Sequence, residues 1–445
     1  MRDLPRSVNP WAVATLLAGM TAAVLDGSLV NLALPSITRE LGIAPAQTMW
    51  VVNAYQLTIA VLLLPLSSLG ERVGYRRVYL TGVAVFMCGA VACALAPSLP
   101  LLIAARVVQG IGGAGLMCVT GALVRHIYSP ERLGRGIGLN AVVVSVASAS
   151  GPAVAALVLS VASWKWLFVL CVPACIFTLL VGPRALPSNT PIDAQFDARS
   201  AALSGLSICL LILGCDGLGL PETRPLALLE IAASVVLGFI LIRKQRNVHA
   251  PLLPIDLFRN PAFSLAVGTS LCSFIAQMTA LLALPFLLEF ALHRSHAETG
   301  LLITPWAVAA GFTALVAGRL ADRYPAGILV SLGLGLMAVG IAASALLPQD
   351  ASIADVIWRT ALCGLGFGLF QSPNNRALLG VAPRERAGGA SGVQATTRLL
   401  GQSLGTAMVA VIFNLAPGNG ARHALFAAAA AAALGAIVSA LRLRA

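Results

Sequence analysis

Long apolar segments, separated by short polar ones, follow one another along nearly the whole chain. A helix that crosses the hydrocarbon core of a bilayer needs about 20 mainly apolar residues. The pattern predicts fourteen such helices, at 11–33, 48–69, 78–97, 100–124, 134–160, 165–183, 200–219, 225–243, 262–290, 298–319, 326–347, 354–380, 388–414 and 421–441. It lacks the short alternating segments of a transmembrane barrel. The sequence therefore predicts an all-α polytopic membrane protein.

Composition supports the same class. Of the 445 residues, 58% are hydrophobic and only 10% are charged, whereas soluble domains carry about 25% charged residues. The nine cysteines lie in apolar segments, and none has a metal-ligand spacing with histidine. We therefore interpret them as small buried residues and expect neither a metal nor a cofactor.

The net charge of +12 is unevenly distributed. With both termini in the cytoplasm, 21 of the 29 Lys and Arg residues fall on the inner side, five on the outer side and three within or at the edge of a predicted span. Cytoplasmic loops of membrane proteins collect positive charge in this way. The basic residues thus act as an orientation signal and contact anionic lipid, and a nucleic-acid partner is excluded.

The two longest inner connections, about 184–199 and 244–261, divide the chain. They predict an N-terminal six-helix bundle at 1–183, linker loops with an inserted helix pair at 184–261, and a C-terminal six-helix bundle at 262–445. The two bundles also share a loop pattern, because Ser67–Arg77 and Gly318–Tyr324 place small residues, leucine, an acid and arginine at matching offsets. This repeat is typical of a duplicated transporter fold.

The chain resembles the major facilitator superfamily, and in particular its fourteen-helix drug:proton antiporter family 2. The resemblance rests on an ordered set of motifs, which are Leu25–Pro35, Trp50–Tyr55, Ser67–Arg77, Arg106–Gly112, Gly151-Pro152, Trp164–Phe168 and Gly388–Gly401. It implies two six-helix bundles plus two extra helices, alternating access, and proton-coupled export of small lipophilic compounds. The loop motif departs from the family pattern at Ser67, Glu71 and Tyr75, and the antiporter motif does so at Ala155 and Ala156.

Asp26 is the strongest candidate for the coupling site. It lies nine residues before Pro35, roughly 13 Å from the outer end of the first helix at about 1.5 Å per residue. Arg106 lies about seven residues into the fourth helix, which enters from outside, and so reaches a similar depth. Charged residues at this depth are costly and mark functional sites. We hypothesise that Asp26 binds the coupling proton, a cationic substrate, or both in alternation; the alternative is a structural ion pair.

The resemblance adds Gln109, Asn31 and Tyr55 to this proton- and substrate-binding set. It also implies gating by loop charges, for which the alternative is simple orientation charge; the gating residues are Glu71, Arg72, Gly74, Arg76, Asp322 and Arg323. Gly151 and Pro152 form the antiporter motif. Arg398 is a polar residue of the second bundle, which we interpret as structural.

These features favour a bacterial inner-membrane exporter of lipophilic, in particular cationic, compounds. The five histidines are scattered at loops, which disfavours an enzyme. The expected partners are the substrate and the lipid bilayer, with a monomer unless a periplasmic adaptor is engaged. A dedicated exporter of one metabolite or antibiotic, and a facilitator without proton coupling, remain the alternatives.

Overall fold

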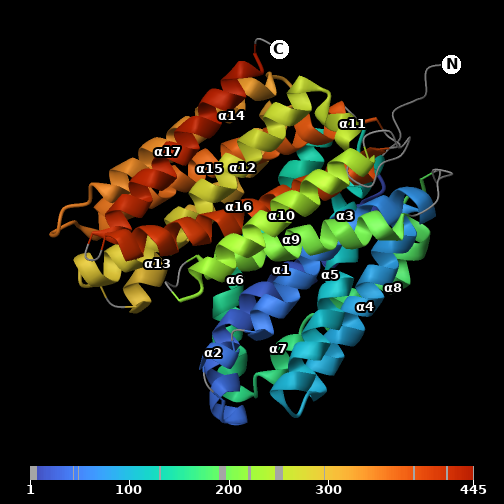
Figure 1. The fold of residues 1–445 in the computed structure, drawn as a ribbon, viewed down its shortest axis with the longest axis horizontal. Helices are drawn as coiled ribbons and strands as arrows, with labels where there is room; N and C mark the ends of the chain where they lie inside the picture. The colour runs from blue at the N-terminus through green and yellow to red at the C-terminus, as the bar shows by residue number, and fades with distance from the viewer. Residues whose placement is uncertain are drawn as a thin grey trace. The chain divides into compact units, whose positions relative to one another are not determined.

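The structure is a computed structural model that describes residues 8–43, 45–48, 50–129, 132–189, 197–218, 222–245, 254–294, 296–383, 386–416 and 419–443. Its described residues form helices joined by short connections (Figure 1). A helix pairs its backbone N–H and C=O groups within one segment, as a lipid environment demands. The predicted all-α class is therefore confirmed.

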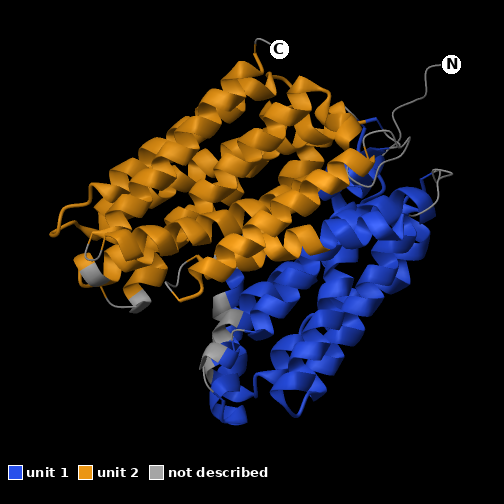
Figure 2. Ribbon diagram, viewed as in Figure 1, with its two compact units in different colours: residues 1–130, 146–205, 383–392 blue, residues 131–145, 206–382, 393–445 orange. Residues whose placement is uncertain are grey.

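The chain divides into two compact units (Figure 2). Unit 1 comprises Met1–Pro130, Val146–Gly205 and Pro383–Gly392. The helices that lie entirely within it are α1 (Pro10–Leu41), α2 (Pro45–Thr48), α3 (Trp50–Val73), α4 (Tyr75–Leu95), α5 (Leu99–Ile127), α7 (Lys165–Val169) and α8 (Val172–Ala185).

Unit 2 comprises Glu131–Ser145, Leu206–Ala382 and Val393–Ala445. The elements entirely within it are α10 (Arg224–Gln245), α11 (Ile255–Phe258), α12 (Pro261–Phe286), the π-helix η2 (Leu287–Ala291), α13 (His296–Leu320), α14 (Ala326–Ala345), α15 (Ile353–Val381) and α17 (Gly420–Leu441). Three helices contribute residues to both units, namely α6 (Leu133–Val161), α9 (Ala198–Gly217) and α16 (Ala387–Leu415).

The expected spans correspond to these helices one by one. Thirteen helices among the described residues are long and apolar enough to cross a membrane, with α7 and α8 forming one span, Lys165–Ala185. The 29-residue α6 supplies the fourteenth helix. Local sequence explains where α1 begins and ends. Asn9 accepts a hydrogen bond from Trp11 N at its start, and Gly42 ends it in the left-handed conformation. Both are common capping devices.

Small residues hold the helices of each unit together. A Cβ on Gly112 of α5 would lie 2.1 Å from the Phe86 backbone nitrogen of α4, and one on Gly366 of α15 would lie 2.4 Å from Met337 N of α14. Lipid tails are as apolar as leucine, so helices in a membrane associate through close packing rather than through exclusion of water. The two units thus use the same contact at corresponding helix pairs, as expected for a duplicated fold.

Candidate functional site

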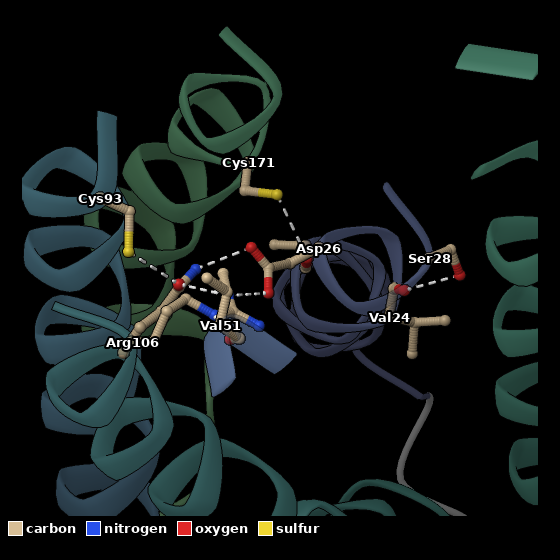
Figure 3. A network of polar contacts seen from close by, with 9 residues as sticks. Val24, Asp26, Ser28, Val51, Cys93, Arg106 and Cys171 are labelled. Carbon is tan, nitrogen blue, oxygen red and sulfur yellow. Dashed lines mark hydrogen bonds and ion pairs between the residues drawn. The ribbon is translucent and has the colours of Figure 1, made fainter. Parts of the chain in front are cut away.

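Asp26 and Arg106 form a buried ion pair between α1 and α5. Arg106 Nη1 lies 2.7 Å from Asp26 Oδ2, and the two residues are 0% and 1% exposed, respectively. Figure 3 shows the Asp26 carboxylate directed from α1 toward Arg106. The prediction that both residues reach the same depth is therefore confirmed.

Gln109 completes the environment of the carboxylate. Its Nε2 donates to Asp26 Oδ1 at 2.9 Å, and its Oε1 accepts from Arg106 Nη1 at 2.7 Å. Arg106 and Gln109 stand three residues apart on α5, so both face the same neighbour. Each oxygen of Asp26 thus has its own donor.

Arg106 also binds the third helix of this cluster. Its Nε donates to the backbone carbonyl of Val51 at 2.8 Å, and its guanidinium carbon lies 4.1 Å from the ring centroid of Tyr55. Both partners belong to α3. A cation over an aromatic face is stabilised electrostatically. One guanidinium therefore connects α1, α3 and α5, and the structure places Tyr55 at the site as predicted.

Two thiols lie around this pair (Figure 3). Cys93 Sγ lies 3.6 Å from Gln109 Oε1, and Cys171 Sγ donates to the Ala22 carbonyl of α1 at 3.3 Å. Both cysteines are buried. Ser28 points the other way on α1 and donates to the Val24 carbonyl at 3.2 Å. The surroundings of the ion pair are therefore weakly polar and closed.

This geometry limits what the site can do chemically. The carboxylate and the guanidinium balance each other, as a buried pair must if its desolvation is to be offset. A cation larger than a proton cannot contact Asp26 unless the helices move, because both oxygens are bound and the residue is 1% exposed. A proton needs no such space.

Gly151 of the antiporter motif lies where α6 crosses α1. A Cβ at this position would stand 2.4 Å from the Ser28 Cβ, so only glycine allows this approach. Pro152 follows it in α6, and Asn31 lies in α1. The side chains of these two predicted residues lie outside the described part of the structure.

The loop acid of unit 1 is buried in a charged cluster. Glu71 Oε2 lies 2.5 Å from Arg386 Nη1, and Glu71 Oε1 accepts from Gly389 N at 2.6 Å. The Tyr75 hydroxyl accepts from Gly388 N at 3.0 Å. These bonds connect the end of α3 to the start of α16, inside the Pro383–Gly392 segment of unit 1.

The loop acid of unit 2 has matching contacts. Asp322 Oδ1 accepts from Gly134 N at 3.1 Å and lies 3.3 Å from Arg376 Nε. These bonds connect the end of α13 to the start of α6, inside the Glu131–Ser145 segment of unit 2. Burial raises the pKa of Asp322, although Arg376 and Arg135 oppose the shift. Each loop acid therefore anchors the start of a helix.

The other predicted gating residues lie near these clusters. Arg72 donates to the Ser68 carbonyl at 2.9 Å, and Arg76 donates to the Pro183 carbonyl at 3.1 Å. Gly74 has a φ of 109°, a conformation that strongly favours glycine, and it lets α4 begin at once after α3. Arg323 is exposed, and Arg398 of the second bundle is half-buried in α16.

Sequence reasoning missed the Val51 carbonyl, both thiols and Arg386. The Val51 contact carries no side-chain signal, because it uses a backbone oxygen. Arg386 does leave a signal in the sequence. It lies immediately before the thirteenth predicted helix, and an arginine that is buried there needs an acidic partner.

Comparisons with known proteins identify the family of this chain. Residues 16–406 match the Major Facilitator Superfamily. The chain is 48% identical over 442 residues to the uncharacterized transporter YebQ of Escherichia coli, covering 99% of this chain and 97% of that protein. It is 30% identical over 404 residues to the multidrug efflux pump LfrA of Mycolicibacterium smegmatis, covering 90% and 80%.

The crystal structure of the human organic anion transporter MFSD10 shares the fold, with a TM-score of 0.69 at 16% identity over 97% of this chain and 98% of that one. The relatives and the structural neighbour are transporters rather than enzymes. With its membrane-spanning helices, its repeated loop clusters and a match over most of its length, this multi-pass membrane protein belongs to the Major Facilitator Superfamily.

Proposed function

We propose that this transporter exports lipophilic cations from the bacterial cytoplasm in exchange for protons, with both of its termini on the cytoplasmic side. The observation that carries the proton exchange in this proposal is the enclosed Asp26–Arg106–Gln109 cluster of α1 and α5. A relative at 30% identity is a multidrug efflux pump, which supports export of lipophilic compounds by this chain as well.

The ion pair suits proton exchange better than direct capture of a substrate. Protonation would remove the negative charge of Asp26 and weaken its charge-assisted bond to Arg106, and such bonds are about twice as strong as neutral ones. Arg106 also holds the Val51 carbonyl of α3. Gain or loss of a proton at Asp26 therefore changes the contacts among three helices. We assign the substrate to a separate place in the transport path.

The two loop clusters would respond to such a change. Glu71 holds the start of α16 and Asp322 holds the start of α6, each within its own unit. A rocking transporter alternates between two packings of its helices. In this proposal the clusters lock one of the two arrangements, and their release belongs to each transport cycle.

Proton exchange supplies enough free energy for drug export. One proton moving through 100 mV releases about 2.3 kcal/mol, and one pH unit adds about 1.4 kcal/mol. The sum corresponds to roughly several hundred-fold accumulation of an uncharged substrate for one proton per substrate. Export of a monovalent cation against the same potential takes back about 2.3 kcal/mol, so one-for-one exchange of a cation leaves about 1.4 kcal/mol, a ~10-fold concentration ratio per pH unit.

Ethidium transport into everted membrane vesicles tests the proposal. Vesicles energised by respiration should take up ethidium, and an uncoupler should abolish the uptake. Vesicles with Asp26→Asn protein at equal expression should show no energised uptake. Uptake that ignores the uncoupler would identify a facilitator, and an absence of ethidium uptake together with gradient-driven export of one metabolite would identify a dedicated exporter.

A further inference from the structure

Unit 2 contains a cavity, far along the chain from the Asp26 cluster. It has a volume of about 550 Å³, within the range of about 300–1,000 Å³ typical of small-molecule sites. It lies where α12, α16 and α17 reach the end of the unit that the charge pattern places outside. Its described lining includes Phe286, Leu287, His293, Phe413, Asn419 and Arg422.

One part of the lining is apolar. Phe286 and Phe413 pack edge to face, with ring centroids 4.9 Å apart at 89°, and Leu287 adjoins them. The exposed faces and edges of such a pair accept a flat apolar group. This wall therefore suits the hydrophobic body of a ligand.

The other part of the lining is polar and positively charged. Arg422 lies in the first turn of α17 and donates through Nη2 to the Leu347 carbonyl at 3.1 Å, which fixes the guanidinium without neutralising it. None of the described residues that line the cavity is acidic. An arginine with remaining donors and no acidic residue beside it in the described lining complements an anionic group.

The backbone beside the cavity has two unusual conformations. The π-helix Leu287–Ala291 replaces the last turn of α12, and His293 is the one non-glycine residue with positive φ among the described residues, at 53°. Turns of π-helix are frequent at functional sites, and residues in the left-handed region carry strain that the surrounding structure must maintain. Here both features position residues that line the cavity.

We propose that this cavity is a binding site for an amphipathic organic anion, with its apolar body against Phe286 and Phe413 and its acidic group at Arg422. The site is independent of the proton exchange proposed for Asp26. It adds a second class of ligand, opposite in charge to the exported cations.

Calorimetric titration of the purified protein in detergent tests this inference, with naphthalene-2-sulfonate as the probe and detergent micelles alone as the blank. We expect saturable binding to the unmodified protein. Naphthalen-2-ylmethylammonium, with the same ring system and the opposite charge, should not displace bound sulfonate, because as a lipophilic cation it would occupy the transport path instead. Displacement of the sulfonate by the ammonium compound at equal affinity would overturn the proposal, because it would show an apolar site without charge selection, as would an absence of saturable sulfonate binding.

Variants locate the probe. Arg422→Gln should weaken sulfonate binding at least ~10-fold, as expected for the loss of a charged hydrogen bond, and Arg422→Lys should restore part of it. Arg224→Gln is the matched control, because Arg224 also starts a helix and donates to a loop carbonyl, that of Leu218. It should bind as the unmodified protein does.

Asp26→Asn separates this proposal from the transport mechanism. That variant should lose energised ethidium uptake and keep sulfonate binding. Unchanged sulfonate affinity in Arg422→Gln would remove the assignment of the anion to this cavity, whatever the transport assay shows.

Discussion

Neutralising Asp26 alone should destabilise the protein much more than neutralising Asp26 and Arg106 together. Asp26→Asn leaves the Arg106 guanidinium charged and 0% exposed, with neutral acceptors such as the Val51 carbonyl and the Gln109 amide oxygen in place of a carboxylate. Arg106→Gln leaves the carboxylate buried without its cation. In both single variants, a desolvated charge loses its counter-charge.

The expected magnitudes follow from this charge balance. Breaking a buried ion pair by removing one partner costs about 3–5 kcal/mol, whereas replacing both partners is often close to neutral. If their effects were independent, the two single substitutions together would lower the free energy of unfolding by about 6–10 kcal/mol. We expect the double variant Asp26→Asn/Arg106→Gln to lose less stability than either single variant.

Thermal unfolding of purified variants in one detergent gives the order of stability. The exposed ion pair between Glu40 and Lys165, 3.6 Å long with side chains 45% and 39% exposed, is the matched control. Exposed pairs contribute about 0–1 kcal/mol, so Glu40→Gln and Lys165→Met should change the midpoint little. A double Asp26/Arg106 variant whose midpoint falls by the sum of the single effects would refute the reasoning.

Three further predictions concern the helix contacts and the loop clusters. Glu71→Gln should lower stability by about 3–5 kcal/mol, because it leaves the buried Arg386 without its counter-charge; thermal unfolding in detergent measures this. Gly112→Val should prevent close packing of α4 and α5 and reduce the monodisperse fraction in size-exclusion chromatography, whereas Gly335→Val, where a Cβ meets nothing within 4 Å, should not. The folded-state pKa of Asp322 is raised above 3.8, so ionisation is disfavoured in the fold. Relative to Asp322→Asn, the protein should therefore lose stability as the pH rises from about 4 through that raised pKa, and a constant difference between the two would contradict this.

The sequence contains most of the information needed for the fold of the helices. Span length, the inward excess of arginine and the repeated loop pattern together predicted the fourteen helices and their order. These signals are strong because the hydrocarbon core dictates both the length and the composition of a crossing segment.

The Asp26–Arg106 pair was also predictable, because depth along two antiparallel helices follows from counting residues at about 1.5 Å each. The backbone partner at Val51 was not, since a carbonyl leaves no trace in the sequence. The residue count along each helix shows which side chains lie at the same depth in the membrane, and the packing of the helices determines which of them are in contact.

The contacts of the loop acids with helix starts were harder to foresee. Hydropathy places Glu71 and Gly389 at the same membrane surface, but 318 positions apart along the chain. The contact arises because Pro383–Gly392 packs with unit 1 and Glu131–Ser145 packs with unit 2. Such an assignment depends on three-dimensional packing that no local pattern encodes. The π-helix at Leu287–Ala291 was likewise not predicted from the sequence.

Proton release upon substrate binding tests the central claim most directly. Purified protein in weakly buffered detergent solution would receive ethidium while a pH indicator records the protons set free. If Asp26 holds the exchangeable proton, unmodified protein that has first been equilibrated at a pH low enough to protonate Asp26 should release protons as ethidium binds, and Asp26→Asn protein treated in the same way should bind ethidium with no release. Equal proton release from both proteins would contradict the account.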